Sequence, residues 1–68
     1  MTDLKITGIV VLEKNGFIQM QVRTPSTRKG YYVEASVPKD HGAEAVAALV
    51  AQAEALAKAY KVEMESQL

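Results

Sequence analysis

The 68-residue sequence contains no cysteine, no tryptophan and a single histidine, His41. The lack of cysteine excludes disulfides and thiolate-ligated zinc, and one imidazole is too few for a structural zinc site. A domain of this length buries only about 60% of the surface that its unfolded chain exposes, so its core is thin. We therefore predict one domain, residues 1–68, without metal or cofactor, for which association with a second chain is the remaining common source of stability.

Long apolar stretches are also missing. The run Ile9–Leu12 is far shorter than the roughly 20 apolar residues that span a bilayer. The first residues include Asp3 and lack the basic start and apolar stretch of a secretory signal. Together with the lack of cysteine, these features predict a cytoplasmic protein with no membrane association.

The residue sets that carry catalysis are absent from the sequence. His41 stands alone, whereas a general base needs a positioned partner. Ser26, Ser36 and Ser66 have no nucleophile motif around them, and the four glycines are isolated rather than grouped in a phosphate-binding loop. We predict that the chain is not an enzyme and has no small-molecule substrate.

The sequence does contain a clear pattern of β-strands. Residues 4–13 are rich in Ile, Val and Thr, and Asn15-Gly16 then forms the strongest short hairpin signal, because both residue types accept positive φ. Residues 17–23 and 31–37 alternate apolar and polar side chains, with a polar loop at 24–30 between them. The pattern predicts three antiparallel strands, at about 4–13, 17–23 and 31–37.

One long C-terminal helix is predicted over residues from about 41 to 64. Asp40 is a suitable N-cap, because its carboxylate can accept a bond from a free N–H of the first turn. Apolar residues then recur at spacings of three and four: Val46, Leu49, Ala53, Leu56 and Tyr60, widened by Val50, Ala57 and Met64. Such a helix is roughly 35 Å long at 1.5 Å per residue, so its last two turns are expected to overhang the sheet. The predicted fold class is α+β, a three-stranded antiparallel β-meander packed on one C-terminal helix.

The register of the first hairpin has two interpretations. A two-residue turn at Asn15-Gly16 places Ile9 and Val11 toward the helix and Val10 and Leu12 on the opposite face, because directly opposed residues share a face. A three-residue loop reverses these assignments, and a bulge at Gly8 would also shift the count. In either register two branched aliphatic residues lie on the face away from the helix, which suggests that something covers it.

The face away from the helix is the candidate binding surface. Gln19, Gln21 and Arg23 follow one another on the central strand, and strict alternation places Tyr32 on the neighbouring strand beside them. Glutamine and arginine can read base edges in a major groove, and Lys14, Arg28 and Lys29 could hold phosphates. An ordinary solvated sheet face favours the same residue types, and Glu34 on this face opposes nucleic-acid binding.

Charge is distributed unevenly along the chain. Residues 1–30 hold five basic and two acidic residues, a net charge of +3, whereas residues 31–68 hold three basic and six acidic residues, a net charge of −3. Such asymmetry either marks a face for an anionic partner or arises by chance in a short chain.

The order of elements resembles two families of DNA-binding domain. The stretches ITGIVV, NGFIQMQVR and TRKGYYVEASVPKDHGAEAVAAL are similar to the three strands and helix of the arm-site-binding domain of tyrosine integrases and of plant ethylene-response factors. Phe17 after the first turn and Arg23 closing the second strand match residues usual in those families. Thr7, Ile9 and Val10 stand where those families carry further arginines. The resemblance implies DNA binding through the sheet face.

Two functions are therefore expected from the sequence. The first is a small non-enzymatic module that binds nucleic acid through Lys14, Gln19, Gln21, Arg23, Arg28, Lys29 and Tyr32. The alternative is a protein-interaction module, either a homodimer or a phage-type inhibitor of a host protein, which the aliphatic residues on the outer face and the thin core favour.

Overall fold

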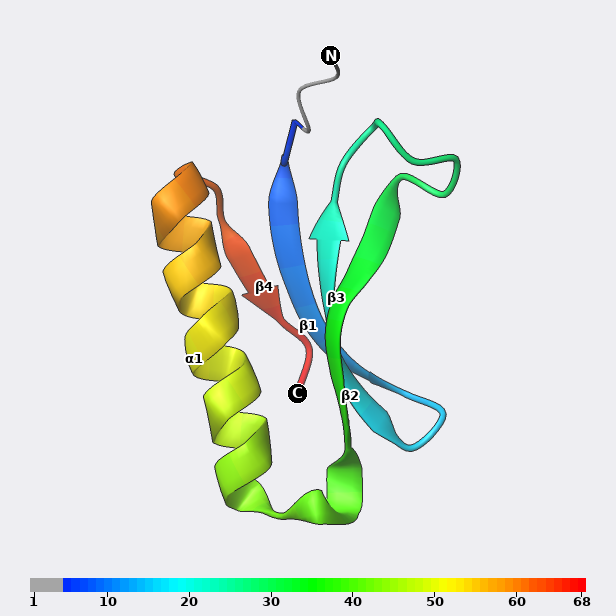
Figure 1. Ribbon diagram of the computed structural model, residues 1–68, viewed down its shortest axis with the longest axis vertical. Helices are drawn as coiled ribbons and strands as arrows, with labels where there is room; N and C mark the ends of the chain where they lie inside the picture. Colours follow the sequence, from blue (N-terminus) through cyan, green and yellow to red (C-terminus); the bar gives the residue numbers. More distant parts are fainter. Residues whose placement is uncertain (1–4) are drawn as a thin grey trace.

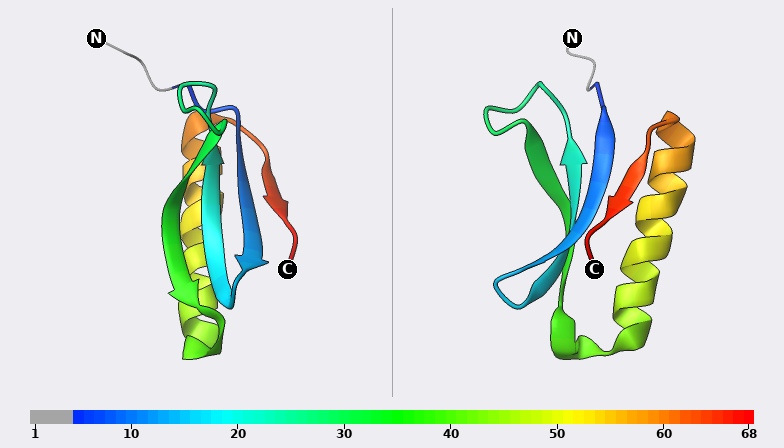
Figure 2. Two further views of the ribbon diagram at one scale, coloured as in Figure 1. Left: turned by 90° about the vertical axis from the view of Figure 1, so that its right-hand side faces the viewer. Right: turned by 180° about the vertical axis from the view of Figure 1, so that it is seen from behind.

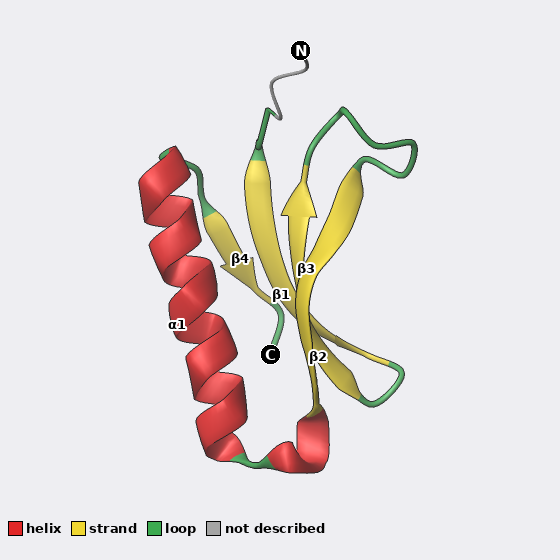
Figure 3. Ribbon diagram, viewed as in Figure 1, coloured by secondary structure: helices red, strands yellow, loops and turns green. Residues whose placement is uncertain are grey.

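The computed structural model describes residues 5–68 and shows an α+β fold (Figure 1). The elements follow the order β1 (Gly8–Lys14), β2 (Phe17–Arg23), β3 (Tyr31–Pro38), a 3-10 turn (Lys39–His41), α1 (Ala43–Tyr60) and β4 (Met64–Ser66). The four strands form one mixed sheet in the order β3-β2-β1-β4, in which β4 pairs parallel to β1 and the other neighbours are antiparallel. Figure 3 shows the helix as a single layer beside this sheet.

The predicted antiparallel meander is confirmed, with corrected ends. β2 spans the predicted residues, β3 extends by one residue to Pro38, and β1 begins at Gly8 and continues to Lys14. The predicted start of the first strand at Leu4 lies outside the described residues.

The β1–β2 hairpin has the two-residue turn. Asn15 and Gly16 have φ angles of 55° and 82°, as the type I′ turn requires, and Lys14 pairs with Phe17. Val11 therefore opposes Met20 on the helix side, and Val10 lies on the opposite face.

A β-bulge in β3 changes which residues face the helix. Met20 pairs with Ala35, but the next residue, Gln21, pairs with Val33, so that Glu34 is the extra residue. Because side chains alternate with a period of two, one extra residue exchanges the faces of everything beyond it. Tyr32 consequently pairs with Val22 on the helix side. The prediction that Tyr32 lies on the face away from the helix was wrong, since it assumed strict alternation.

The helix is shorter than predicted at both ends. Asp40 lies in the 3-10 turn and is not the N-cap; α1 begins after Gly42, which makes no side-chain cap bond. α1 ends at Tyr60, and Lys61 adopts the left-handed conformation with a φ of 57°. The N–H of Val62 then donates to the carbonyl of Ala57 at 2.9 Å, which closes the helix with a Schellman-type bond.

The chain beyond Tyr60, predicted to continue the helix to about residue 64, turns back instead, and Met64–Ser66 form β4. Ile9 pairs with Met64 and Val10 with Glu65, and the N–H of Gln67 donates to the carbonyl of Val11 at 2.8 Å. The helix is therefore not the last element, and the predicted overhang was wrong. Met64 does pack against the core, as expected, but it does so from the strand rather than from the helix.

The core lies between α1 and one face of the sheet (Figure 2). Three residues of the predicted helical stripe, Leu49, Ala53 and Ala57, are buried there, whereas Tyr60 is 51% exposed. They pack with the buried side chains that β1 and β2 send to this face, Ile9, Val11, Ile18 and Met20. Alanine at the centre of the helix interface lets the backbone of α1 approach the sheet closely, so that a thin core is filled without large side chains.

The end of α1 provides a test of this fold. Lys61→Gly is expected to raise the free energy of unfolding by about 1 kcal/mol, because glycine avoids the steric cost of left-handed backbone. The matched change Lys58→Gly, inside the helix, is expected to lower it by about 1 kcal/mol. Urea unfolding of both variants checks this. Loss of stability in Lys61→Gly would indicate that the helix continues through residue 61.

Candidate nucleic-acid interface

The face of the sheet opposite α1, called the outer face below, has no second layer over it within residues 5–68 (Figure 2). Its members follow from the strand pairing, because paired residues share a face. They are Gly8, Val10, Leu12, Lys14, Phe17, Gln19, Gln21, Arg23, Tyr31, Val33, Ser36, Pro38 and Glu65.

The two glutamines at the centre of the outer face are less available than predicted. Gln21 is only 9% exposed, and its side-chain Nε2 donates to Oε1 of Gln19 at 3.2 Å. Gln19 is half-buried. The predicted residues are thus together on one face, but their amides form a flat polar strip rather than side chains that could reach into a groove.

Aromatic side chains lie at the two ends of this strip. Phe17, at the hairpin end of β2, is 43% exposed. Tyr31, at the other end of the outer face, pairs with Arg23 and is half-buried. Phe17 could have been included from the hairpin register alone. Tyr31 could not, because only the bulge at Glu34 brings it to this face.

The predicted basic residues separate into two groups. Arg23 is exposed at the end of β2, and the loop of residues 24–30 that carries the exposed Arg28 and Lys29 follows directly. Lys14 is exposed at the hairpin, at the opposite end of the sheet (Figure 1). Three of the four cations are therefore near Tyr31, and one is near Phe17.

The loop between β2 and β3 is held by its own hydrogen bonds. Thr24 is 1% exposed; its N–H donates to the carbonyl of Gly30 at 2.9 Å, and its hydroxyl accepts from the N–H of Ser26 at 3.2 Å. The hydroxyl of Thr27 is within hydrogen-bond distance of the carbonyl of Tyr31, at 3.1 Å. These bonds close the loop and fix the place from which Arg28 and Lys29 extend.

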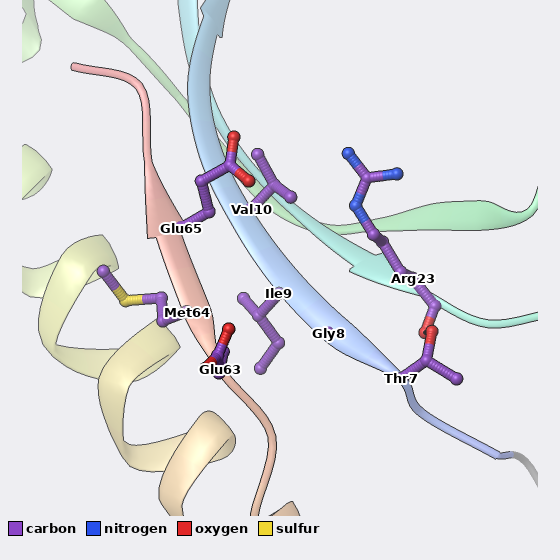
Figure 4. A pocket seen from close by; sticks show the side chains of 8 residues that line it. All are labelled: Thr7, Gly8, Ile9, Val10, Arg23, Glu63, Met64 and Glu65. Carbon is purple, nitrogen blue, oxygen red and sulfur yellow. The ribbon is translucent and has the colours of Figure 1, made fainter.

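A hollow of about 390 Å³ lies where β1 begins (Figure 4). Arg23 and Glu65 extend on the same side of the sheet, with Val10 between them and the backbone of Gly8 beneath Arg23. Val10 is 2% exposed, since Gln21 and Glu65 flank it in the sheet. The whole lining consists of Thr7, Gly8, Ile9, Val10, Arg23, Glu63, Met64 and Glu65.

The charges around the outer face are sparsely paired. The ion pair found among residues 5–68 joins Lys39 to Glu13 at 3.1 Å, away from the hollow. Glu65 accepts a hydrogen bond from Nε2 of Gln67 at 2.7 Å. Over the same residues no group of histidine, cysteine, aspartate and glutamate side chains could hold a metal ion, and His41 is exposed in the 3-10 turn. No helix of the described chain is long and apolar enough to cross a membrane.

Comparison with known protein families, curated proteins and solved structures finds no match to this chain. The likeness to integrase and ethylene-response-factor domains thus stays an expectation from the sequence. The fold itself adds a fourth, parallel strand to the order of three strands and a helix on which that likeness is based.

Tyr32 has an electrostatic signature of its position on the helix side. Burial raises the pKa of Tyr32 above the usual tyrosine value, and the nearby Glu34 carboxylate and Tyr60 raise it further. Because the folded protein holds this proton more tightly than the unfolded chain, Tyr32 destabilises the fold only as the pH rises above the unfolded tyrosine pKa.

Tyrosinate absorbance tests this placement of Tyr32. We expect one component of the alkaline titration to lie above the usual tyrosine range, and Tyr32→Phe to remove it. The control Tyr31→Phe should retain it. If Tyr31→Phe removed that component instead, the bulge at Glu34 would be misplaced and the two tyrosines would have exchanged faces.

Proposed function

We propose that this protein binds single-stranded nucleic acid across the outer face. One observation carries the proposal: the uncovered face presents an aromatic ring at each end, Phe17 and Tyr31, with Arg23 and the basic loop beside one of them. Unpaired bases stack on aromatic rings regardless of sequence, and basic side chains next to such a platform hold the phosphates.

A single strand suits this face better than the major groove of a duplex. Reading base edges in a groove requires side chains that protrude along the strand. Here Gln21 is buried and bonded to Gln19, so the centre of the face is flat. A flat, partly apolar centre between two rings instead favours unstacked bases lying on the sheet.

The charge distribution favours the same face. The basic residues Arg23, Arg28 and Lys29 gather at one end of the sheet, whereas α1, behind it, carries Glu44 and Glu54 against Lys58, a net charge of −1. A strand of nucleic acid therefore meets net positive charge when it approaches the outer face and net negative charge when it approaches the helix. Electrostatic attraction of this kind weakens as salt increases.

Fluorescence anisotropy with labelled oligonucleotides tests the proposal. Single-stranded DNA or RNA of about 12 nucleotides, within the site sizes typical of small single-strand-binding domains, should bind at micromolar protein. Affinity should fall between low and high salt, and duplex of the same sequence should bind more weakly. Absence of salt-sensitive binding to any single strand would overturn the proposal.

A matched pair of variants locates the binding face. Phe17→Ala should weaken binding by about 1–3 kcal/mol, the usual contribution of one stacked base. Tyr60→Ala removes a ring of similar exposure from the helix and should leave affinity unchanged. Equal losses in both variants would place the nucleic acid somewhere other than the outer face.

A second candidate function, homodimerisation through the outer face, is favoured by its apolar members. Val33 is 46% exposed and Phe17 43% exposed, and Leu12 is half-buried on the same face. Two such faces could pack as a sandwich of sheets. The dimer and the nucleic acid would compete for the same surface.

Sedimentation equilibrium distinguishes the two candidates. If the outer face dimerises, the protein should be a dimer at tens of micromolar and Val33→Lys should make it a monomer, while Lys58→Glu on the helix should have no effect. A monomer at that concentration would exclude a stable dimer and leave the outer face open for nucleic acid.

A further inference from the structure

We infer that the hollow at the start of β1 is a base-specific subsite that takes guanine. The inference rests on the proposed function, because the hollow is part of the outer face and continues the platform past Arg23. It goes beyond that function, since stacking on Phe17 and Tyr31 does not distinguish one base from another.

Gly8 is what leaves the hollow open. A Cβ atom at this position would lie 3.8 Å from Cδ of Arg23 and 3.9 Å from the carbonyl oxygen of Glu63, which are ordinary contact distances. The backbone of Gly8 is not among the positive-φ glycines, so its conformation does not require glycine. Space, rather than backbone conformation, is therefore what this glycine provides.

The walls of the hollow match the chemistry of a nucleobase. Arg23 and Glu65 supply a hydrogen-bond donor and an acceptor from the strands on either side of β1, and the covered side chain of Val10 lies between them. Those two strands are two strand spacings apart, roughly 10 Å. Arg23 pairs with Gly8 and Glu65 with Val10, an offset of two residues or about 7 Å along β1, so the two residues start roughly 12 Å apart. A hydrogen bond of about 2.9 Å on each side then leaves about 6 Å, enough for a planar base, between the two side chains.

Guanine is the base that satisfies both walls best. An arginine donates a bidentate pair of hydrogen bonds to O6 and N7 of guanine. An ionised carboxylate can only accept hydrogen bonds. On the edge adjacent to O6 and N7, guanine offers it two donor groups, N1–H and the 2-amino group. Thymine and uracil lack an amino group, and adenine offers only one to a carboxylate. Cytosine carries its amino group on the same edge as its acceptors N3 and O2, so it cannot meet the arginine and the carboxylate on different edges.

The guanine subsite accounts for the presence of the Glu65 carboxylate on the outer face. A carboxylate on a face that binds phosphates lowers affinity unless it is used for something else. One hydrogen bond from Gln67, at 2.7 Å, holds this carboxylate in place. A positioned carboxylate beside an exposed arginine repels phosphate at that point and selects bases that carry donors.

The experiment uses two sets of ligands with the full chain. The first is an oligothymidylate of about 12 nucleotides that carries one central dG, dA or dC in place of thymine. We expect the dG oligonucleotide to bind about tenfold more tightly than the all-thymine strand, as one bidentate base contact allows. The second set is the four ribonucleoside monophosphates, each titrated into 15N-labelled protein and followed by NMR. Of the four, GMP should cause the largest changes in the amide chemical shifts of Gly8, Val10 and Glu65.

Two variants locate the preference. Glu65→Gln and Gly8→Val should each abolish the advantage of the dG strand over the all-thymine strand. Glu65→Gln should not weaken binding of the all-thymine strand, because it removes a negative charge from the outer face, and any gain in affinity should be equal for the two strands. Gly8→Ala is the milder substitution if Gly8→Val unfolds the chain, since its Cβ meets only ordinary contacts. Glu54→Gln on α1 is the matched control and should keep the full preference.

The outcomes separate the subsite from the proposed function. Equal affinity for the dG and all-thymine strands, with no selective effect of GMP, would overturn the guanine subsite and leave single-strand binding standing. Selective and Glu65-dependent binding of GMP without binding of any oligonucleotide would support the subsite and overturn the strand-binding function. No binding of either ligand set would overturn both.

Discussion

The packing of α1 against one face of the sheet is the contact on which the rest of the structure depends. A single helix can cover only one face, and it does so through small residues, with Ala53 fully buried against side chains such as Val11 and Met20. This close approach buries the alternate residues of β1 and β2. The remaining residues of β1 and β2, among them Val10 and Arg23, point to the outer face, which nothing in the described chain covers.

The termination of α1 at Lys61 completes the sheet and shapes the candidate site. Because Lys61 adopts left-handed backbone, the chain reverses and lays Met64–Ser66 along β1. Met64 then adds to the core, while Glu65, the next residue, necessarily points to the outer face beside Val10. The hollow at Gly8 thus depends on a turn of the chain at the far end of the helix.

The outer face joins two kinds of surface that a helix would otherwise hide. Its centre is a flat strip of glutamine amides and aliphatic carbon, and its ends carry rings and cations. Rings, a flat centre and positive charge together suit a ligand that is planar, partly apolar and anionic, as single-stranded nucleic acid is. The same apolar area is the reason for proposing a second copy of the chain as a competing occupant.

Local signals in the sequence determined the meander. Asn15-Gly16 accepts positive φ at both positions, so the turn and the bounds of β2 follow from the sequence alone. The choice between the two possible registers, and with it the outward position of Val10, came from the structure. The cluster of Gln19, Gln21 and Arg23 on one face follows from strict alternation along residues 17–23.

Tertiary structure decided the rest, because the contacts responsible are distant in sequence. Nothing in the alternation of residues 31–37 marks Glu34 as the bulged residue, yet that one residue moves Tyr32 to the helix side and Tyr31 to the outer face. The helical periodicity of the sequence continues through Met64, and lysine at position 61 does not by itself end a helix. The sequence therefore gave no sign that residues 64–66 pair with a strand near the start of the chain. Local propensity specifies turns and strands. The end of the helix depends instead on the pairing of residues 64–66 with the edge of β1, which is a contact distant in sequence.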